Sequence, residues 1–546
     1  MEQLKPDSPE ASTREAGVLR VLARRKVRVV AYTLRAAASL ALMLLPGRLG
    51  RTRGIAGVVS AGIGAAYAPL QRFGSDGADQ ATVIAQASNA VARFGGDDVK
   101  QYALVFQAAQ VTMSYGVAGW AKVLGEPWRD GTAVRDILRT KSYGHKGFWC
   151  FLRDHPLIAK ALTWGVVVWE AIFPVVLFLP HLAAKGMAAI GLLFHVGNGP
   201  AMGLWRFIFA FASLHPALHR VIDRDVPISV VRRVTVLSGV MLAGAWVRSA
   251  IQGRRRARYV RRLYAELDQV ATRRGAHIPV EISVGNDNAP VAILEGGLLA
   301  MSEQFHWVAA ALASRGWTVL RTTRADYVSS SVRDAASASL DSKAEDLADV
   351  VAHVAARWPG RRICLVGHSL GGEIARRAGL QTDATDVVLL DPTHPNQFVD
   401  SQVQSGSRTR FTEQIKLFQL ILNLGFGSFM TRPEAMASLP ADVARDAMSK
   451  YSDAHLWNAG AREWKEVVDQ FSSRQHVPAS ERPTLVISAG RTVEADAVLR
   501  KLHSELASDR HEVVDDVTHE SLLSNQTHAQ RCAEIVIDWM ESRNGA

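Results

Sequence analysis

The sequence of 546 residues predicts a multidomain protein, in which an all-α part with several membrane spans precedes an α/β part with a mostly parallel sheet and a helical lid. Three observations carry this prediction. The first half of the chain contains long apolar stretches with few charges. In the second half, short apolar runs alternate with helical patterns, which is typical of a parallel sheet. A Gly-x-Ser-x-Gly stretch, residues 367–371, lies between one such run and the helix after it.

Membrane spans are expected within residues 27–252, after a polar tail of residues 1–26. A helix needs about 20 residues to cross the hydrocarbon core of a bilayer. Six apolar stretches come near this length or exceed it, except that the last is short, so we expect five or six spans. The stretches are 29–45, 54–70, 102–124, 157–180, 181–214 and 234–247. The fifth should break at Gly-Asn-Gly-Pro, residues 197–200. The alternative is a soluble bundle of buried helices.

The basic residues indicate how this part is oriented. The chain has 63 Lys and Arg against 52 Asp and Glu, a formal net charge of +11. Basic clusters at residues 24–26 and 254–262 flank the apolar stretches. Such clusters favour an anionic lipid bilayer over nucleic acid as the partner, and the positive-inside tendency places both on the cytoplasmic side. We therefore expect a multi-pass protein of the cell membrane whose second part is cytoplasmic.

A serine at the apex of a tight turn is the main candidate for catalysis. Residues 363–366 are apolar enough for a strand and residues 373–377 suit the start of a helix, so Ser369 lies in a strand–turn–helix unit. The glycines two residues before and after it allow a sharp turn and a close approach of strand and helix. The turn exposes the serine hydroxyl to a base. A glycine-rich loop with a bystander serine is the alternative.

The base and the acid should follow the serine along the chain. A serine hydroxyl becomes a good nucleophile when a histidine takes its proton and a carboxylate orients that histidine. His519 lies just past a short strand at residues 512–514 and is the expected base. The alternatives are His503, His511 and His528, of which the first and the last are expected on exposed helix faces.

Two positions compete for the acid. Asp391 ends the strand at residues 387–390, whereas Glu494, or its neighbour Asp496, follows the strand at residues 484–489. Residues 491–493 contain no aspartate, which favours Asp391. Its alternative role is to cap the turn before the next proline. The acid stays open between Asp391 and Glu494.

Backbone N–H groups near the serine can stabilise a negatively charged oxygen. Glu295-Gly296-Gly297-Leu298 follows a buried strand at residues 291–294. The expected donors are the N–H groups of Gly297, Leu298 and Leu370. With the serine turn and the late histidine, residues 290–543 resemble the α/β-hydrolase fold. The resemblance implies a serine hydrolase of the esterase, lipase or thioesterase type, and places His-Gly-Gly where this chain begins with Glu295.

A linker and an insertion complete the expected domain plan. Residues 253–289 should form a basic helix, to about residue 274, and then a turn-forming stretch that leads into the hydrolase domain, residues 290–546. Residues 397–482 lie between two strands, where the fold carries its lid. Their apolar stretch, residues 415–426, would line an acyl pocket, contact the bilayer or pack as an ordinary core helix.

The membrane part carries a motif of its own. Tyr115-x-x-Ala-Gly-x-x-Lys122 is followed by a Trp-x-x-Gly stretch at residues 128–131, and later by Trp169-Glu170, Phe194-His195 and Gly203-Leu204-Trp205. Residues 73–216 resemble the HTTM family, a membrane domain related to the vitamin K-dependent γ-glutamyl carboxylase. The resemblance implies that Lys122 is a base, because the matching lysine of the carboxylase deprotonates reduced vitamin K. Glu170 would be its ion-pair partner, and a purely structural pair is the alternative.

These features predict a membrane-anchored serine hydrolase that cleaves a small-molecule or lipid-like ester or thioester with an apolar acyl group. No metal or organic cofactor is expected for that chemistry. The cysteines, Cys150, Cys364 and Cys532, have no spacing typical of disulfides or zinc sites. The alternatives are a carboxylase- or oxidoreductase-like membrane enzyme centred on Lys122, and a membrane protein without enzymatic activity.

Overall fold

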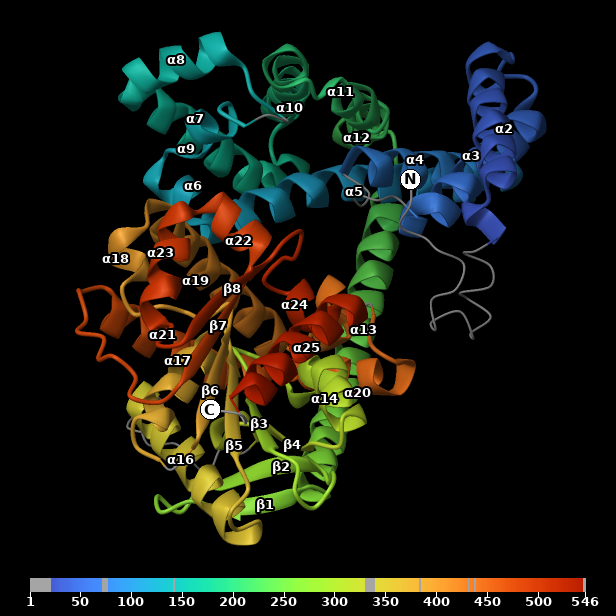
Figure 1. The fold of residues 1–546 in the computed structure, drawn as a ribbon. Helices are drawn as coiled ribbons and strands as arrows, with labels where there is room; N and C mark the ends of the chain where they lie inside the picture. The colour runs from blue at the N-terminus through green and yellow to red at the C-terminus, as the bar shows by residue number, and fades with distance from the viewer. Residues whose placement is uncertain are drawn as a thin grey trace. The chain divides into compact units, whose positions relative to one another are not determined.

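The structure, a computed structural model, describes residues 21–70, 77–140, 143–328, 339–382, 384–430, 432–436 and 438–543. The chain divides into two compact units, Met1–Gly244 and Ala245–Ala546 (Figure 1). The division falls inside helix α13 (Ile228–Ala265), a little before the expected boundary at residue 252. Most of the expected polar tail lies outside the described residues.

The first unit is built of helices. Each expected apolar stretch lies wholly or largely in one of the longer helices, and the short helices connect them. The helices are α2 (Arg25–Leu44), α3 (Gly50–Tyr67), α4 (Gly77–Phe94), α5 (Asp97–Leu124), α6 (Glu126–Asp130), α7 (Ala133–Ile137), α8 (Lys146–Asp154), α9 (Pro156–Ile172), α10 (His181–Met202), α11 (Trp205–Ala212), α12 (His215–Ile222) and the beginning of α13. Tyr115, Phe173 and Phe211 are buried in its core.

Three of the described helices are long and apolar enough to cross a membrane. They are Arg25–Leu44, Pro156–Leu177 and Ile228–Ala265, each with a mean hydropathy of 1.5. This set is smaller than the five or six spans expected from the apolar stretches, so the number of spans stays a prediction.

Helix α10 differs from the expectation that the fifth apolar stretch would break at residues 197–200. The helix continues through Pro200 and ends at Met202. Gly203 follows with a φ of 71°, and its N–H donates to the carbonyls of the preceding turn. A glycine in this left-handed conformation is a usual way to end a helix. The chain therefore breaks at Gly203, a few residues later than expected.

The second unit contains a sheet of eight strands in the order β1-β2-β4-β3-β5-β6-β7-β8. From β4 through β8 neighbouring strands are parallel, whereas β1 and β2 add an antiparallel edge. The strands are β1 (Asp268–Ala271), β2 (His277–Ser283), β3 (Val291–Glu295), β4 (Thr318–Thr322), β5 (Ile363–His368), β6 (Asp386–Leu390), β7 (Thr484–Ala489) and β8 (Arg510–Val514).

The expected linker is wrong in its second half. Residues 253–265 continue α13, but the basic helix does not extend to residue 274, and residues 268–283 form β1 and β2 of the sheet. In β1 only Val270 is buried. A strand at the edge of a sheet with so little apolar surface has no clear signal in the sequence.

Helices cover both faces of the sheet. Successive residues of a strand point to opposite faces. Ile293 and Leu365 therefore pack in one core with α16 (Leu340–Arg357) and α17 (Leu370–Gly379). Leu294 and Val366 pack in the other core with α14 (His306–Ser314) and α25 (Gln526–Ser542). The central strand β5 is buried along its whole length, which gives the residue after it a rigid support.

The insertion between β6 and β7 is helical. It contains α18 (Gln397–Asp400), α19 (Gln402–Asn423), α20 (Ala441–Tyr451) and α21 (Ala454–Phe471). Ile415, Leu422 and Trp457 pack in one cluster with Leu299, which follows β3. The final part of α13 is bonded to the same insertion, since Tyr259 donates to Asp446 at 2.7 Å.

Candidate active site

Ser369 lies in a turn whose geometry depends on its glycines. It follows β5 and precedes α17, with φ 55° and ψ −124°. A left-handed conformation is strained for any residue except glycine, and such strain is common at functional sites. A Cβ on Gly367 would lie 2.2 Å from the carbonyl oxygen of Gly371, and one on Gly371 would lie 2.3 Å from that of Gly296. Both positions therefore require glycine for the turn to close.

His519 and Asp391 are brought together from separate strands. Asp391 directly follows β6 and His519 follows β8, so both lie at the carboxyl edge of the parallel sheet, as Ser369 does. His519 Nδ1 lies 2.7 Å from Asp391 Oδ2. The Ala489 N–H donates to Asp391 Oδ1 at 2.9 Å and the Thr492 hydroxyl donates to Oδ2 at 3.0 Å. These donors hold the carboxylate in one orientation.

Glu494 and Asp496 do not lie at His519. The Glu494 side chain is 55% exposed on α22 (Gly490–Ala495), where it is 4.0 Å from Arg491. Asp496 accepts a hydrogen bond from Ser401 and caps α23 (Ala497–Leu506) through the Val498 N–H. Each of these two carboxylates therefore has a partner other than His519.

The alternative histidines have different surroundings. His503 is buried on α23, contrary to the expected exposed position, because it lies under the sheet edge, 2.7 Å from Ser488 Oγ and 3.9 Å from Asp391 Oδ1. His511 shares the Ser488 hydroxyl at 2.8 Å. His528 Nδ1 is 3.1 Å from Ser521 Oγ. His519 is 35% exposed and has the shortest contact with Asp391.

The electrostatics of this pair suit a general base. Burial alone would raise the pKa of Asp391, but the hydrogen bond and charge of His519 hold that pKa below its ordinary value. Burial also opposes charge on His519, yet the hydrogen bond to Asp391 and its negative charge raise the pKa of His519 above 6.5. Burial lowers the pKa of the neighbouring His368 to about 3, so His368 is neutral. Its Nε2 lies 3.1 Å from the His519 carbonyl oxygen, which supports the loop that carries the base.

The loop after β3 lies directly against the serine. A Cβ on Gly297 would lie 3.0 Å from Ser369 Cβ and 3.4 Å from Ser369 Oγ. Leu370 is the first residue of α17, beside the same hydroxyl. Leu298 is partly buried and packs against the core next to Gly297. The structure thus places the expected donor segments at Ser369, and their role in binding an oxyanion stays a prediction.

Sequence reasoning missed Arg324, which supports this loop. Its guanidinium donates to the carbonyl oxygens of Gly296 and Gly297, the latter at 2.8 Å. It also lies 2.9 Å from Glu295, the residue that departs from the family pattern. The position of Arg324, two residues beyond β4 and thus near the same sheet edge, was the available signal.

In the first unit, Lys122 on α5 and Glu170 on α9 form a pair. Lys122 Nζ lies 2.5 Å from Glu170 Oε2, and the two side chains are 22% and 5% exposed. The helices are in close contact there, since a Cβ on Gly119 would lie 2.2 Å from the Ala171 nitrogen. Within the described ranges no group of three or more His, Cys, Asp and Glu is arranged to hold a metal ion.

A family model described as the alpha/beta hydrolase family matches residues 296–535. No curated protein sequence matches the chain. Among solved structures, an esterase from Exiguobacterium antarcticum is 17% identical, covers 50% of this chain and 98% of its own, and has a TM-score of 0.36. An esterase from Thermogutta terrifontis is 16% identical, with 51% and 98% covered and a TM-score of 0.37. An epoxide hydrolase from Vigna radiata is 15% identical, with 51% and 98% covered and a TM-score of 0.39. The family match and the eight-stranded, mostly parallel sheet show that the second half of the chain carries an alpha/beta hydrolase domain.

Proposed function

We propose that this domain is a serine hydrolase that cleaves an ester or thioester with an apolar acyl group. The observation that carries the proposal is the 2.7 Å contact between His519 and Asp391 at the sheet edge that also holds the strained Ser369. A serine, a histidine and a buried carboxylate at one edge are the parts that acyl transfer needs. The loop after β3, residues 296–299 (the oxyanion loop), contacts the helical lid through Leu299, which packs with Ile415, Leu422 and Trp457. This apolar cluster supports an apolar acyl group.

The proposed reaction has two halves. Ser369 Oγ attacks the carbonyl carbon while its proton passes to His519, whose imidazolium is stabilised by Asp391. The N–H groups of Gly297, Leu298 or Leu370 bind the oxygen that becomes negative. The carbon–oxygen or carbon–sulfur bond then breaks, and His519 gives its proton to the leaving alcohol or thiol. A water molecule repeats the sequence on the acyl-enzyme and releases the acid.

A fluorophosphonate probe tests this proposal without knowledge of the substrate. The probe phosphonylates an activated serine, so the full-length chain should be labelled and Ser369→Ala should not be. Ser314→Ala, at an exposed position of α14, is the matched control and should be labelled like the wild type. Labelling of Ser369→Ala at the wild-type rate, or no labelling of the wild type and of Ser314→Ala, would contradict the proposal.

We further propose that the first unit anchors the enzyme in the cell membrane as a multi-pass domain of the HTTM type, with the hydrolase domain in the cytoplasm. Three apolar helices of sufficient length and the flanking basic clusters support this anchoring. The bilayer and a lipid-like or small-molecule ester are then the expected partners.

A second function is favoured by the pair in the first unit. Lys122 and Glu170 lie 2.5 Å apart on neighbouring helices, and ionisable groups within membrane segments are often functional. A carboxylase- or oxidoreductase-like reaction with Lys122 as the base is the second candidate, the hydrolase domain then processing its product.

A further inference from the structure

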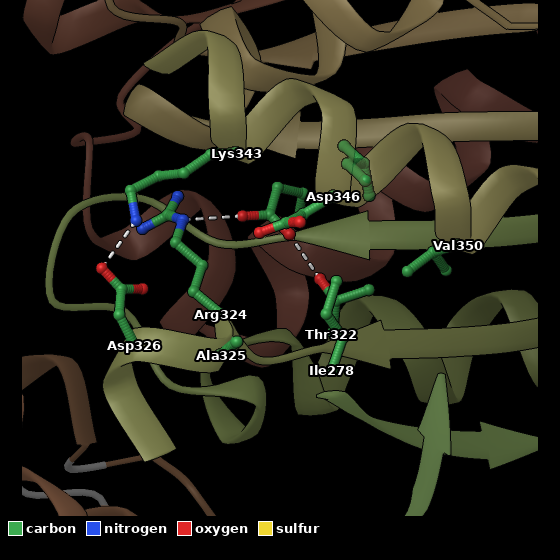
Figure 2. Close-up of a pocket in the computed structure, with 10 residues that line it drawn as sticks. Ile278, Thr322, Arg324, Ala325, Asp326, Lys343, Asp346 and Val350 are labelled. Carbon is green, nitrogen blue, oxygen red and sulfur yellow. Dashed lines mark hydrogen bonds and ion pairs between the residues drawn. The ribbon is translucent and has the colours of Figure 1, made fainter. Parts of the chain in front are cut away.

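A buried group of charged side chains lies between the oxyanion loop and the lid. Figure 2 shows three of its members, Arg324, Asp326 and Lys343, with the Lys343 ammonium facing the Asp326 carboxylate. The group consists of Glu295, Arg324, Asp326, Lys343 and Glu463, whose side chains are at most 7% exposed. The cavity beside it has a volume of about 20 Å³, which has room for one water molecule but for no substrate.

Arg324 fixes the direction of two peptide groups in the oxyanion loop. Its guanidinium binds the carbonyl oxygens of Gly296 and Gly297. In a trans peptide the carbonyl of one residue and the N–H of the next point in opposite directions, and the described chain has no cis peptide bond. The N–H groups of Gly297 and Leu298 must therefore point away from Arg324. Gly297 lies against Ser369, so this orientation is the one that an oxyanion hole requires.

The same guanidinium reaches the lid. Glu463, fully buried on α21, lies 3.3 Å from Arg324 and accepts a hydrogen bond from the Tyr327 hydroxyl. That hydroxyl also accepts the Leu299 N–H at 2.9 Å, at the end of the oxyanion loop. Arg324 is therefore the shared neighbour of the loop and the lid.

The remaining charges hold Arg324 in place. Glu295 lies 2.9 Å from it, and Lys343 lies 2.8 Å from Asp326 and 3.8 Å from Glu463. A planar guanidinium can bind two carbonyls and two carboxylates at once, whereas a lysine ammonium on a flexible stem cannot reproduce this arrangement. At position 295, where the resembled fold carries histidine, the glutamate pairs with the arginine that binds the loop carbonyls.

We propose that Arg324 is a positioning residue that orients the N–H groups of Gly297 and Leu298, and that Glu463 couples this orientation to lid helix α21. The inference rests on the proposed serine hydrolase function, because the oriented groups act on the oxyanion of that reaction. Arg324 does not touch the reacting atoms in this scheme.

The test compares two arginines in the full-length protein. Arg324→Gln removes the proposed contacts. The matched control is Arg362→Gln, whose arginine binds the buried Asp386 at 2.8 Å and the Met540 carbonyl at 3.0 Å, at the opposite end of β5 from Ser369. Arg324→Lys is a milder variant in case Arg324→Gln fails to fold. The readouts are kcat and KM for a short-chain ester, the rate of fluorophosphonate labelling, and hydrogen exchange of the amides at residues 296–300.

A displaced oxyanion donor should lower kcat and the labelling rate about 10- to 100-fold with little change in KM. We expect this loss in Arg324→Gln and Arg324→Lys but not in Arg362→Gln, together with faster exchange at residues 296–300. Glu463→Gln retains an acceptor for Tyr327 but loses the charge beside Arg324, so it should show a smaller loss and faster exchange in the same segment.

Two outcomes would overturn the inference. One is equal loss of kcat in Arg324→Gln and Arg362→Gln, which would indicate a general effect on folding. The other is unchanged exchange at residues 296–300 in both Arg324 variants. If the wild type itself fails to label at Ser369, the proposed function is wrong, whereas the exchange measurement still decides whether Arg324 holds the loop.

Discussion

Replacement of Asp391 by asparagine is the sharpest test of the candidate triad. The Ala489 N–H is a fixed backbone donor to Oδ1, so the asparagine oxygen should take that position. Its NH₂ group then replaces Oδ2 and faces His519 Nδ1, which was 2.7 Å from a carboxylate oxygen. The amide donates to Nδ1, and the imidazole proton moves to the other nitrogen, on the side where the serine proton should be received.

A histidine with this wrong tautomer cannot act as the base. In serine triads the same substitution costs about 10⁴-fold in kcat, which corresponds to about 5.5 kcal/mol of transition-state stabilisation. We expect a loss of this order here, because Asp391 is buried and its Oδ2 lies 2.7 Å from His519 Nδ1. The assay is kcat for a short-chain ester together with the rate of fluorophosphonate labelling.

The pH profile gives a second signature. In the proposed mechanism the base is neutral His519, so kcat should fall as the pH drops through the pKa of His519, which Asp391 raises above 6.5. Without the carboxylate this pKa should decrease, and the acidic limb of the residual activity should move to lower pH. A purely structural role of Asp391 would not shift the limb.

The control is Glu494→Gln, which changes the exposed glutamate that was the other candidate for the acid of the triad. We expect its kcat to stay within about threefold of the wild type, as for most exposed substitutions. If Glu494→Gln lost activity by orders of magnitude while Asp391→Asn stayed within tenfold of the wild type, the assignment of the acid would be refuted.

Three further predictions concern the loop and the first unit. Gly297→Ala places a Cβ 3.0 Å from Ser369 Cβ and should slow fluorophosphonate labelling about tenfold or more. The control is Gly406→Ala, where the added Cβ meets open space. Equal labelling rates in the two variants would argue against a loop that lies at Ser369. The full chain should stay in the membrane fraction after carbonate or high-salt washing, because spans in hydrocarbon resist both, and its release would refute the spans. Lys122→Met should leave Ser369 labelling intact if Lys122 is a working base, while the activity of the first unit is lost. If the pair is structural, Lys122→Met leaves Glu170 without its partner, which destabilises the protein by about 3–5 kcal/mol and impairs membrane insertion. Insertion should then recover in the double variant Lys122→Met with Glu170→Gln. Full recovery of function in that double variant would rule out Lys122 as a base.

The features that the sequence alone predicted are those that local patterns determine. The alternation of apolar runs and helices predicts the central strands, since buried parallel strands are apolar on both faces. The glycines around Ser369 predict the turn, because a Cβ at Gly367 would collide with the chain only four residues further on. The edge strand β1 escaped prediction because Val270 alone is buried in it.

Two further features were missed because they depend on contacts between residues that are far apart in the sequence. His503 was expected on an exposed helix face, yet Ser488 and Asp391, from two strands, cover it. The role of Arg324 was not foreseen because its partners lie far along the chain, Glu463 being 139 residues away. A helical pattern indicates which face is apolar but not which neighbours a polar side chain finds.

The sequence by itself determined the turn at Ser369, the helical and α/β halves of the chain, and the histidine after the last strand, because each depends on residues close together in the chain. Only the tertiary structure decided which carboxylate reaches His519. Asp391 and Glu494 both follow strands that end at the same edge of the sheet, so their sequence contexts are alike. Asp391 comes directly after β6 and its oxygen lies 2.7 Å from His519. Glu494 is carried outward on α22, where more than half of its side chain is exposed to solvent.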